Sequence, residues 1–135
     1  FVPLAERAGS VNLLTQWVEA TDVPAVHGGY VPYRKALLEH GVKLFELESA
    51  FLHSKSIVVD GVWSSIGSTN FDWRSFVHNN EISVCVIDQG FAQSMSRMFD
   101  ADLADSQEIT LAAWKMRGLR ERLRELMWLP IQYWL

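Results

Sequence analysis

Two apolar runs separated by an Asp-Gly pair are the feature that most constrains how this chain folds. The segment LHSKSIVVDGVWSSIGSTN spans residues 52–70 and is rich in β-branched residues on both sides of that pair. Asp-Gly is among the pairs most favoured in two-residue hairpin turns. The pattern therefore predicts strands over Phe51–Val59 and Val62–Gly67, joined by a turn at Asp60-Gly61.

Polar side chains stand at the outer ends of this predicted hairpin. Alternate side chains of a strand share a face, so His53 and Lys55 are expected to project together. Ser68 and Asn70 have the same two-residue spacing at the end of the returning strand. A buried strand normally avoids such groups unless they are paired or used. The hairpin thus predicts an imidazole, an ammonium, a hydroxyl and an amide at one end of a sheet.

This set of groups suits a phosphate diester. Lys55 and Asn70 can bind the non-bridging oxygens and neutralise charge in the transition state, and His53 can attack phosphorus or carry protons. Glu81 begins a later strand and can orient the second ring nitrogen of His53. Asp60 is interpreted as a turn residue that does not touch substrate. The sequence has no Cys pair, His-x-x-x-His or carboxylate cluster beside the hairpin, so we expect no metal or other cofactor.

The spacing of these residues resembles the HKD signature of the phospholipase D superfamily. The signature residues are His53, Lys55, Asp60, Gly67, Ser68 and Asn70. The continuation FDWRSFVHNNE is similar to that of bacterial cardiolipin synthases, and the positions that carry this likeness are Asp72, Arg74, Ser75, Asn80 and Glu81. The upstream segment GYVPYRKALLEHGVKLFELESAFLHSK and the tail, with Trp114 and an Arg-rich helix, also resemble the second half of those enzymes.

The resemblance implies a two-step mechanism that needs two HKD motifs. One histidine attacks phosphorus to give a phosphohistidine, and a second protonates the leaving alcohol and then activates the incoming alcohol or water. This sequence has one motif, so the other is expected from the rest of a longer chain or from a dimer partner. His53 is the general acid/base if this is the second half, and the nucleophile otherwise. The catalytic residues expected are His53, Lys55, Ser68, Asn70 and Glu81, and Asp60 and Gly67 are expected to be structural.

The resemblance also implies a fold and an extent. We expect an α/β half-domain of the phospholipase D type, with a mixed central sheet flanked by helices, over residues 1–135. A complete half usually carries another strand and helix before the equivalent of Ala5–Val11. The chain is therefore expected to be an N-terminally truncated second half of a longer two-motif protein.

The implied activity is that of a cardiolipin synthase-like phosphatidyltransferase acting on phospholipid. Residues 1–110 hold seven Lys and Arg against fourteen Asp and Glu, whereas residues 111–135 hold five against two. A nucleic-acid partner is therefore not expected, and the C-terminal part is the expected contact with an anionic membrane surface, most simply the bacterial inner membrane. Two alternatives stay open. They are a metal-independent phosphodiesterase or nuclease that acts as a dimer, and a non-catalytic half that only dimerises.

Hydrophobic periodicity predicts the remaining elements. Strands are expected over Val11–Thr15, Val42–Leu47 and Glu81–Ile87, and helices over Tyr33–His40, Phe91–Leu103 and Thr110–Met127. Arg34 and Lys35 are expected on a solvated helix face. The last helix is either packed on the sheet or laid on a membrane, with Trp128, Tyr133 and Trp134 at the lipid interface.

Overall fold

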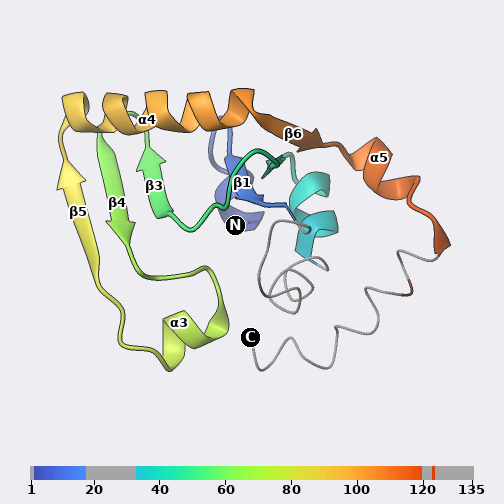
Figure 1. The fold of residues 1–135 in the computed structure, drawn as a ribbon, viewed down its shortest axis with the longest axis horizontal. Helices are drawn as coiled ribbons and strands as arrows, with labels where there is room; N and C mark the ends of the chain where they lie inside the picture. Colours follow the sequence, from blue (N-terminus) through green and yellow to red (C-terminus); the bar gives the residue numbers. More distant parts are fainter. Residues whose placement is uncertain (1, 18–32, 120–122, 124–135) are drawn as a thin grey trace. The chain divides into compact units, whose positions relative to one another are not determined.

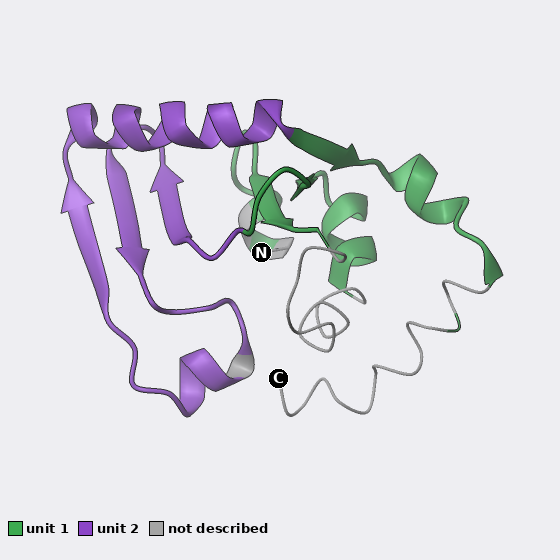
Figure 2. Ribbon diagram, viewed as in Figure 1, with its two compact units in different colours: residues 1–51, 106–135 green, residues 52–105 purple. Residues whose placement is uncertain are grey.

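The computed structural model describes residues 2–17, 33–119 and 123 (Figure 1). They fall into two compact units (Figure 2). Unit 1 comprises residues 1–51 and 106–135, and unit 2 comprises residues 52–105. Each unit has its own three-stranded sheet, and unit 2 contains the predicted hairpin.

Unit 1 is built on a mixed sheet with the strand order β1-β2-β6. The elements described in it are α1 (Val2–Ala5), β1 (Asn12–Gln16), a helix over residues 33–39, β2 (Lys43–Leu47), β6 (Ser106–Ile109) and α5 (Leu111–Lys115). β1 and β2 are parallel, and β6 runs antiparallel to β2. Leu37, Val42 and Leu44 form the core, with Leu13 and Ile109 packed against them.

A buried ion pair joins the helix over residues 33–39 to β2. The Arg34 guanidinium is paired with the Glu46 carboxylate, and Arg34 is only 6% exposed. The guanidinium also lies 5.8 Å from the centre of the buried Trp114 ring. The prediction of a solvated Arg34 is therefore wrong, because β2 presents a carboxylate to it. Lys35 is exposed as predicted and faces Glu39 on the same helix at 3.8 Å.

Unit 2 is built on an antiparallel sheet with the order β3-β4-β5. Its elements are β3 (Lys55–Val59), β4 (Trp63–Gly67), α3 (Trp73–Val77), β5 (Ser83–Ile87) and α4 (Gln89–Ala104). Lys55, Gly67 and Ser83 face one another across the three strands at one end. The helix α4 packs against all three strands near the opposite end, where the β3–β4 turn lies (Figure 1).

The β3–β4 turn uses the Asp-Gly pair as predicted. Asp60 and Gly61 both have positive φ, 51° and 64°, as a type I′ turn requires. The Val62 N–H donates to the Val59 carbonyl across this turn at 3.2 Å. Val59 is paired with Trp63, however, so Val62 lies outside the ladder and β4 begins one residue later than expected.

The α/β class is confirmed, and most predicted elements are present within a residue or two. The helix that starts at Thr110 is capped by the Thr110 hydroxyl, which accepts from the Ala113 N–H at 3.2 Å. α5 ends at Lys115, so the single helix predicted to reach Met127 is interrupted there, and Gly118, which has low helix propensity, follows closely. Leu119 and Leu123 are helical again, and the rest of the predicted span to Met127 lies outside the described residues. Trp128, Tyr133 and Trp134 lie outside the described residues.

Candidate active site

His53 and Lys55 stand at the start of β3. The β3–β4 ladder ends at the Lys55–Gly67 pair, so His53 precedes the strand, and its prediction as a strand residue is wrong. The two residues are nevertheless held together, because the Lys55 ammonium donates to the His53 backbone carbonyl at 2.9 Å. His53 is exposed and Lys55 is half-buried.

An open pocket of about 440 Å³ lies at this end of the unit 2 sheet. Its lining residues are His53, Lys55, Ile66, Gly67, Ser68, Ile82 and Val84. Three of the residues expected from the sequence, His53, Lys55 and Ser68, therefore share one pocket. Asn70 and Glu81 do not line it. Among the described residues, no group of His, Cys, Asp and Glu could hold a metal ion.

Ser68 connects the pocket to the start of β5. Its N–H donates to the Ile82 carbonyl at 2.9 Å, and its hydroxyl accepts from the Ile82 N–H at 3.1 Å. The same hydroxyl donates to a carboxylate oxygen of Glu81. A serine hydroxyl has one proton. In this arrangement Ser68 therefore holds Glu81 rather than donating to a substrate oxygen.

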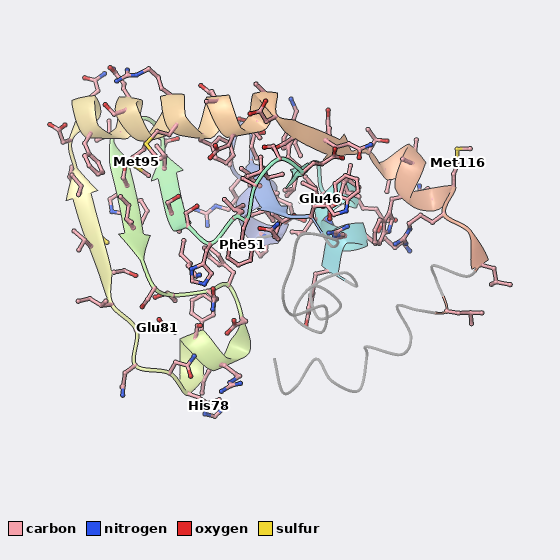
Figure 3. The ribbon with its side chains drawn as sticks, viewed as in Figure 1. Glu46, Phe51, His78, Glu81, Met95 and Met116 are labelled. Carbon is pink, nitrogen blue, oxygen red and sulfur yellow. The ribbon has the colours of Figure 1, made fainter. Side chains whose placement is uncertain are left out.

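Glu81 is the centre of a hydrogen-bonded group beside the pocket. Figure 3 shows it between the strand ends and α3. The Asn79 amide donates to its other carboxylate oxygen at 3.4 Å. The pKa of Glu81 lies below its ordinary value, chiefly because Ser68 donates to it. Desolvation opposes this effect, while Ser75, Asn79 and the Lys55 ammonium add to it.

The remaining predicted residues lie farther from this group or serve the backbone. Asp60 is in the turn at the opposite end of β3 from Lys55. Asp72 caps α3 by accepting from the Ser75 N–H at 2.7 Å. His78 is exposed and lies beyond α3, away from the strand ends (Figure 3). Sequence reasoning missed the role of Asn79, although its position two residues before Glu81 was the available signal.

Comparison with known proteins identifies the family. Residues 2–103 match the family described as "Cardiolipin synthase, PLD-like domain". This chain belongs to that family. A cardiolipin synthase of Staphylococcus aureus strain Mu50 is 35% identical over 117 residues, which cover 87% of this chain and 24% of the relative. Cardiolipin synthase A of Proteus mirabilis is 42% identical over 89 residues, which cover 66% of this chain and 18% of that relative.

A solved structure supports the same fold. Nuc from Salmonella typhimurium, a phospholipase D family member, matches with a TM-score of 0.65 at 20% identity. The match covers 81% of this chain and 70% of Nuc. This chain spans only about a quarter of the length of the cardiolipin synthases that it resembles in sequence. The family assignment and the phospholipase D-like fold therefore apply to the part of the protein that this chain represents.

Gly67 of this cardiolipin synthase-family chain leaves no room for a side chain. A Cβ at this position would lie 2.3 Å from both the Ile82 carbonyl oxygen and the Ser83 hydroxyl. Gly67 is paired with Ser83 of β5, and the next residue, Ser68, is hydrogen-bonded to both the C=O and the N–H of Ile82. Gly67 is thus what permits the contact between the pocket and the start of β5.

Replacing Gly67 with Ala is expected to destabilise the fold by about 1–3 kcal/mol, since overpacking forces backbone shifts. The Gly118→Ala variant is the control, because nothing lies within 4 Å of a Cβ there. Denaturant unfolding of both variants measures the difference. Equal unfolding free energies for the two variants would contradict the close approach of β5 to Gly67.

Proposed function

We propose that this chain carries one of the two catalytic halves of a phospholipase D-type phosphatidyltransferase, similar in activity to cardiolipin synthase. The observation that carries the proposal is the pocket at the end of the unit 2 sheet, where His53, Lys55 and Ser68 lie together. The Lys55 ammonium can neutralise a phosphodiester oxygen, and His53 supplies the nucleophile or the proton carrier. The names of its relatives, cardiolipin synthases, support the same activity.

The reaction proceeds in two balanced steps. In the first, a histidine nitrogen attacks the phosphorus of phosphatidylglycerol, a P–N bond forms, and the P–O bond to glycerol breaks. The histidine of the other motif gives its proton to the departing glycerol oxygen. In the second, that histidine takes a proton from the hydroxyl of another phosphatidylglycerol. The hydroxyl oxygen then attacks phosphorus and the P–N bond breaks, giving cardiolipin.

The second motif must come from another part of a longer protein or from a second copy of the chain. His53 is the general acid/base if the other motif precedes it in the same polypeptide. Asn70 is exposed. In this proposal its amide binds the non-bridging phosphate oxygens when the second motif completes the site. Water in place of the second alcohol would make the same site a hydrolase.

The character of the pocket favours a lipid substrate. Its polar residues are joined by three apolar ones, Ile66, Ile82 and Val84, which are all exposed in this unit. An amphipathic phosphodiester matches such a lining better than a polyanion does. The acidic balance of residues 1–110 also disfavours a long phosphate track. We therefore rank a dimeric nuclease second.

The proposed place of action is the surface of the bacterial inner membrane, where phosphatidylglycerol is presented. The described residues include no helix that is both long and apolar enough to cross a bilayer. The positive balance of residues 111–135 suits contact with anionic headgroups. In this proposal the partners are therefore a phospholipid, an anionic surface and the second HKD motif.

Product analysis tests this proposal. The longest natural chain that contains this sequence is incubated with phosphatidylglycerol vesicles in EDTA, and the lipids are analysed by mass spectrometry. Cardiolipin and free glycerol are expected. Phosphatidic acid alone would replace the transferase by a lipase, and cleavage of DNA without lipid change would replace it by a nuclease.

A further inference from the structure

The segment between β4 and β5 is folded back on itself by backbone bonds. Asp72 caps its short helix α3 at one end. At the other end the N–H groups of His78 and Asn79 both donate to the Arg74 carbonyl at 2.8 Å. The segment is therefore fixed at both ends, and its last backbone bond fixes Asn79, whose side chain donates to Glu81.

Donors from different elements meet at the Glu81 carboxylate. Ser68, from the end of β4, donates to one oxygen, and Asn79 donates to the other at 3.4 Å. A carboxylate bonded at both oxygens has little freedom to rotate.

Glu81 lies one hydrogen bond away from the pocket. Ser68 lines the pocket together with His53 and Lys55, and the same Ser68 hydroxyl donates to Glu81. We propose that Asn79 is a positioning residue, which holds the Glu81 carboxylate so that it can orient His53. The catalytic role of His53 in this inference rests on the proposed function. The hydrogen bonds that support Glu81 are observed independently of that function.

The charges around Glu81 favour its ionised form. The Lys55 ammonium, on β3, lowers its pKa, and the neutral donors from β4 and α3 act in the same direction. The other titratable or charged groups on the adjoining segments are His53, before β3, Cys85, on β5, and three groups at, on and after α3, namely Asp72, Arg74 and His78. Removal of a donor raises the pKa of Glu81 toward its ordinary value.

The chain offers a matched pair of variants for the test. Asn79 and Asn80 are adjacent, exposed and of the same type, and Asn79 is the one that donates to Glu81. In the longest natural chain, Asn79→Ala is expected to lower kcat about 10- to 100-fold, because loss of a hydrogen-bond partner that orients a site residue commonly costs this much activity. KM stays nearly unchanged, and the acid limb of the kcat profile moves to higher pH. Asn80→Ala leaves kcat, KM and the pH profile as they are.

A second readout does not depend on catalysis. Because the folded pKa of Glu81 is lowered, its stabilising bonds are present above the unfolded pKa and are lost as pH falls through the folded pKa. The thermal midpoint of Asn79→Ala should therefore lie below that of wild type at neutral pH, and this difference, called the gap below, should disappear in acid. For Asn80→Ala the difference in thermal midpoint from wild type should not change with pH.

The two readouts separate the possible failures. A gap that is independent of pH, or that is equal in the two variants, overturns the role of Asn79 whatever the activity. A pH-dependent gap confined to Asn79→Ala, with KM-neutral loss of kcat, supports the positioning role. The same gap with no transferase activity in the wild-type protein would reject the proposed function and leave the support of Glu81 standing.

Discussion

Replacing His53 with Ala is expected to lower kcat for phosphatidyl transfer by about 1,000-fold or more. Proton transfer alone commonly contributes 10²- to 10⁴-fold, and loss of a nucleophile removes the covalent route altogether. The fold should be unaffected, because His53 is exposed and precedes β3. Initial rates of cardiolipin formation, with thermal unfolding of the same preparations, measure both effects.

His78 provides the control for this prediction. It is also an exposed histidine of unit 2, but it lies beyond α3 and does not line the pocket. His78→Ala should retain most of the activity. Turnover that survives in His53→Ala, or is lost equally in His78→Ala, would place the chemistry elsewhere in the protein.

Replacing Arg34 with Ala is expected to destabilise the protein by about 3–5 kcal/mol. The substitution removes the guanidinium that is paired with the Glu46 carboxylate, whose side chain is only 13% exposed, and removing one member of such an ion pair is costly. It also removes one of two guanidinium groups that lie near the Trp114 ring. Urea unfolding of the longest natural chain, followed by tryptophan fluorescence, measures the change.

Two further variants test the cause of this effect. Lys35→Ala removes an exposed cation of the same helix and should cost less than about 1 kcal/mol, as exposed pairs do. The double change Arg34→Met with Glu46→Leu should recover much of the loss, because it removes both charges together. A double variant as unstable as Arg34→Ala would show that packing, rather than the broken ion pair, explains the effect.

Local sequence patterns were sufficient for the hairpin and for the polar groups at its open end. The Asp60-Gly61 pair tolerates the positive φ angles of a type I′ turn, as few other pairs do, so these two residues alone located the turn. In the observed register Lys55 is opposite Gly67, one residue beyond the pairing that a two-residue turn implies, and Ser68 follows directly. The pocket lined by His53, Lys55 and Ser68 is a consequence of that register.

The features that escaped prediction depend on contacts between distant segments. The position of His53 before β3 follows from where the β3–β4 ladder ends, which a period-two pattern does not reveal. Arg34 is buried because β2 presents Glu46 to it. β6 is a short polar strand, SQEI, whose pairing with β2 has no strong local signal. Asn79 and Asn80 are indistinguishable by type, and only the backbone bonds after α3 decide which of them reaches Glu81.

A single-turnover experiment tests the central claim most directly. The longest natural chain is mixed, in EDTA, with phosphatidylglycerol labelled at phosphorus and quenched in alkali, which preserves a P–N bond. We predict labelled protein, with the label on a histidine of one of the two motifs, and its transfer into cardiolipin when unlabelled phosphatidylglycerol is added before the quench. Cardiolipin formed in one turnover without labelled protein at any time would contradict phosphatidyl transfer through a phosphohistidine.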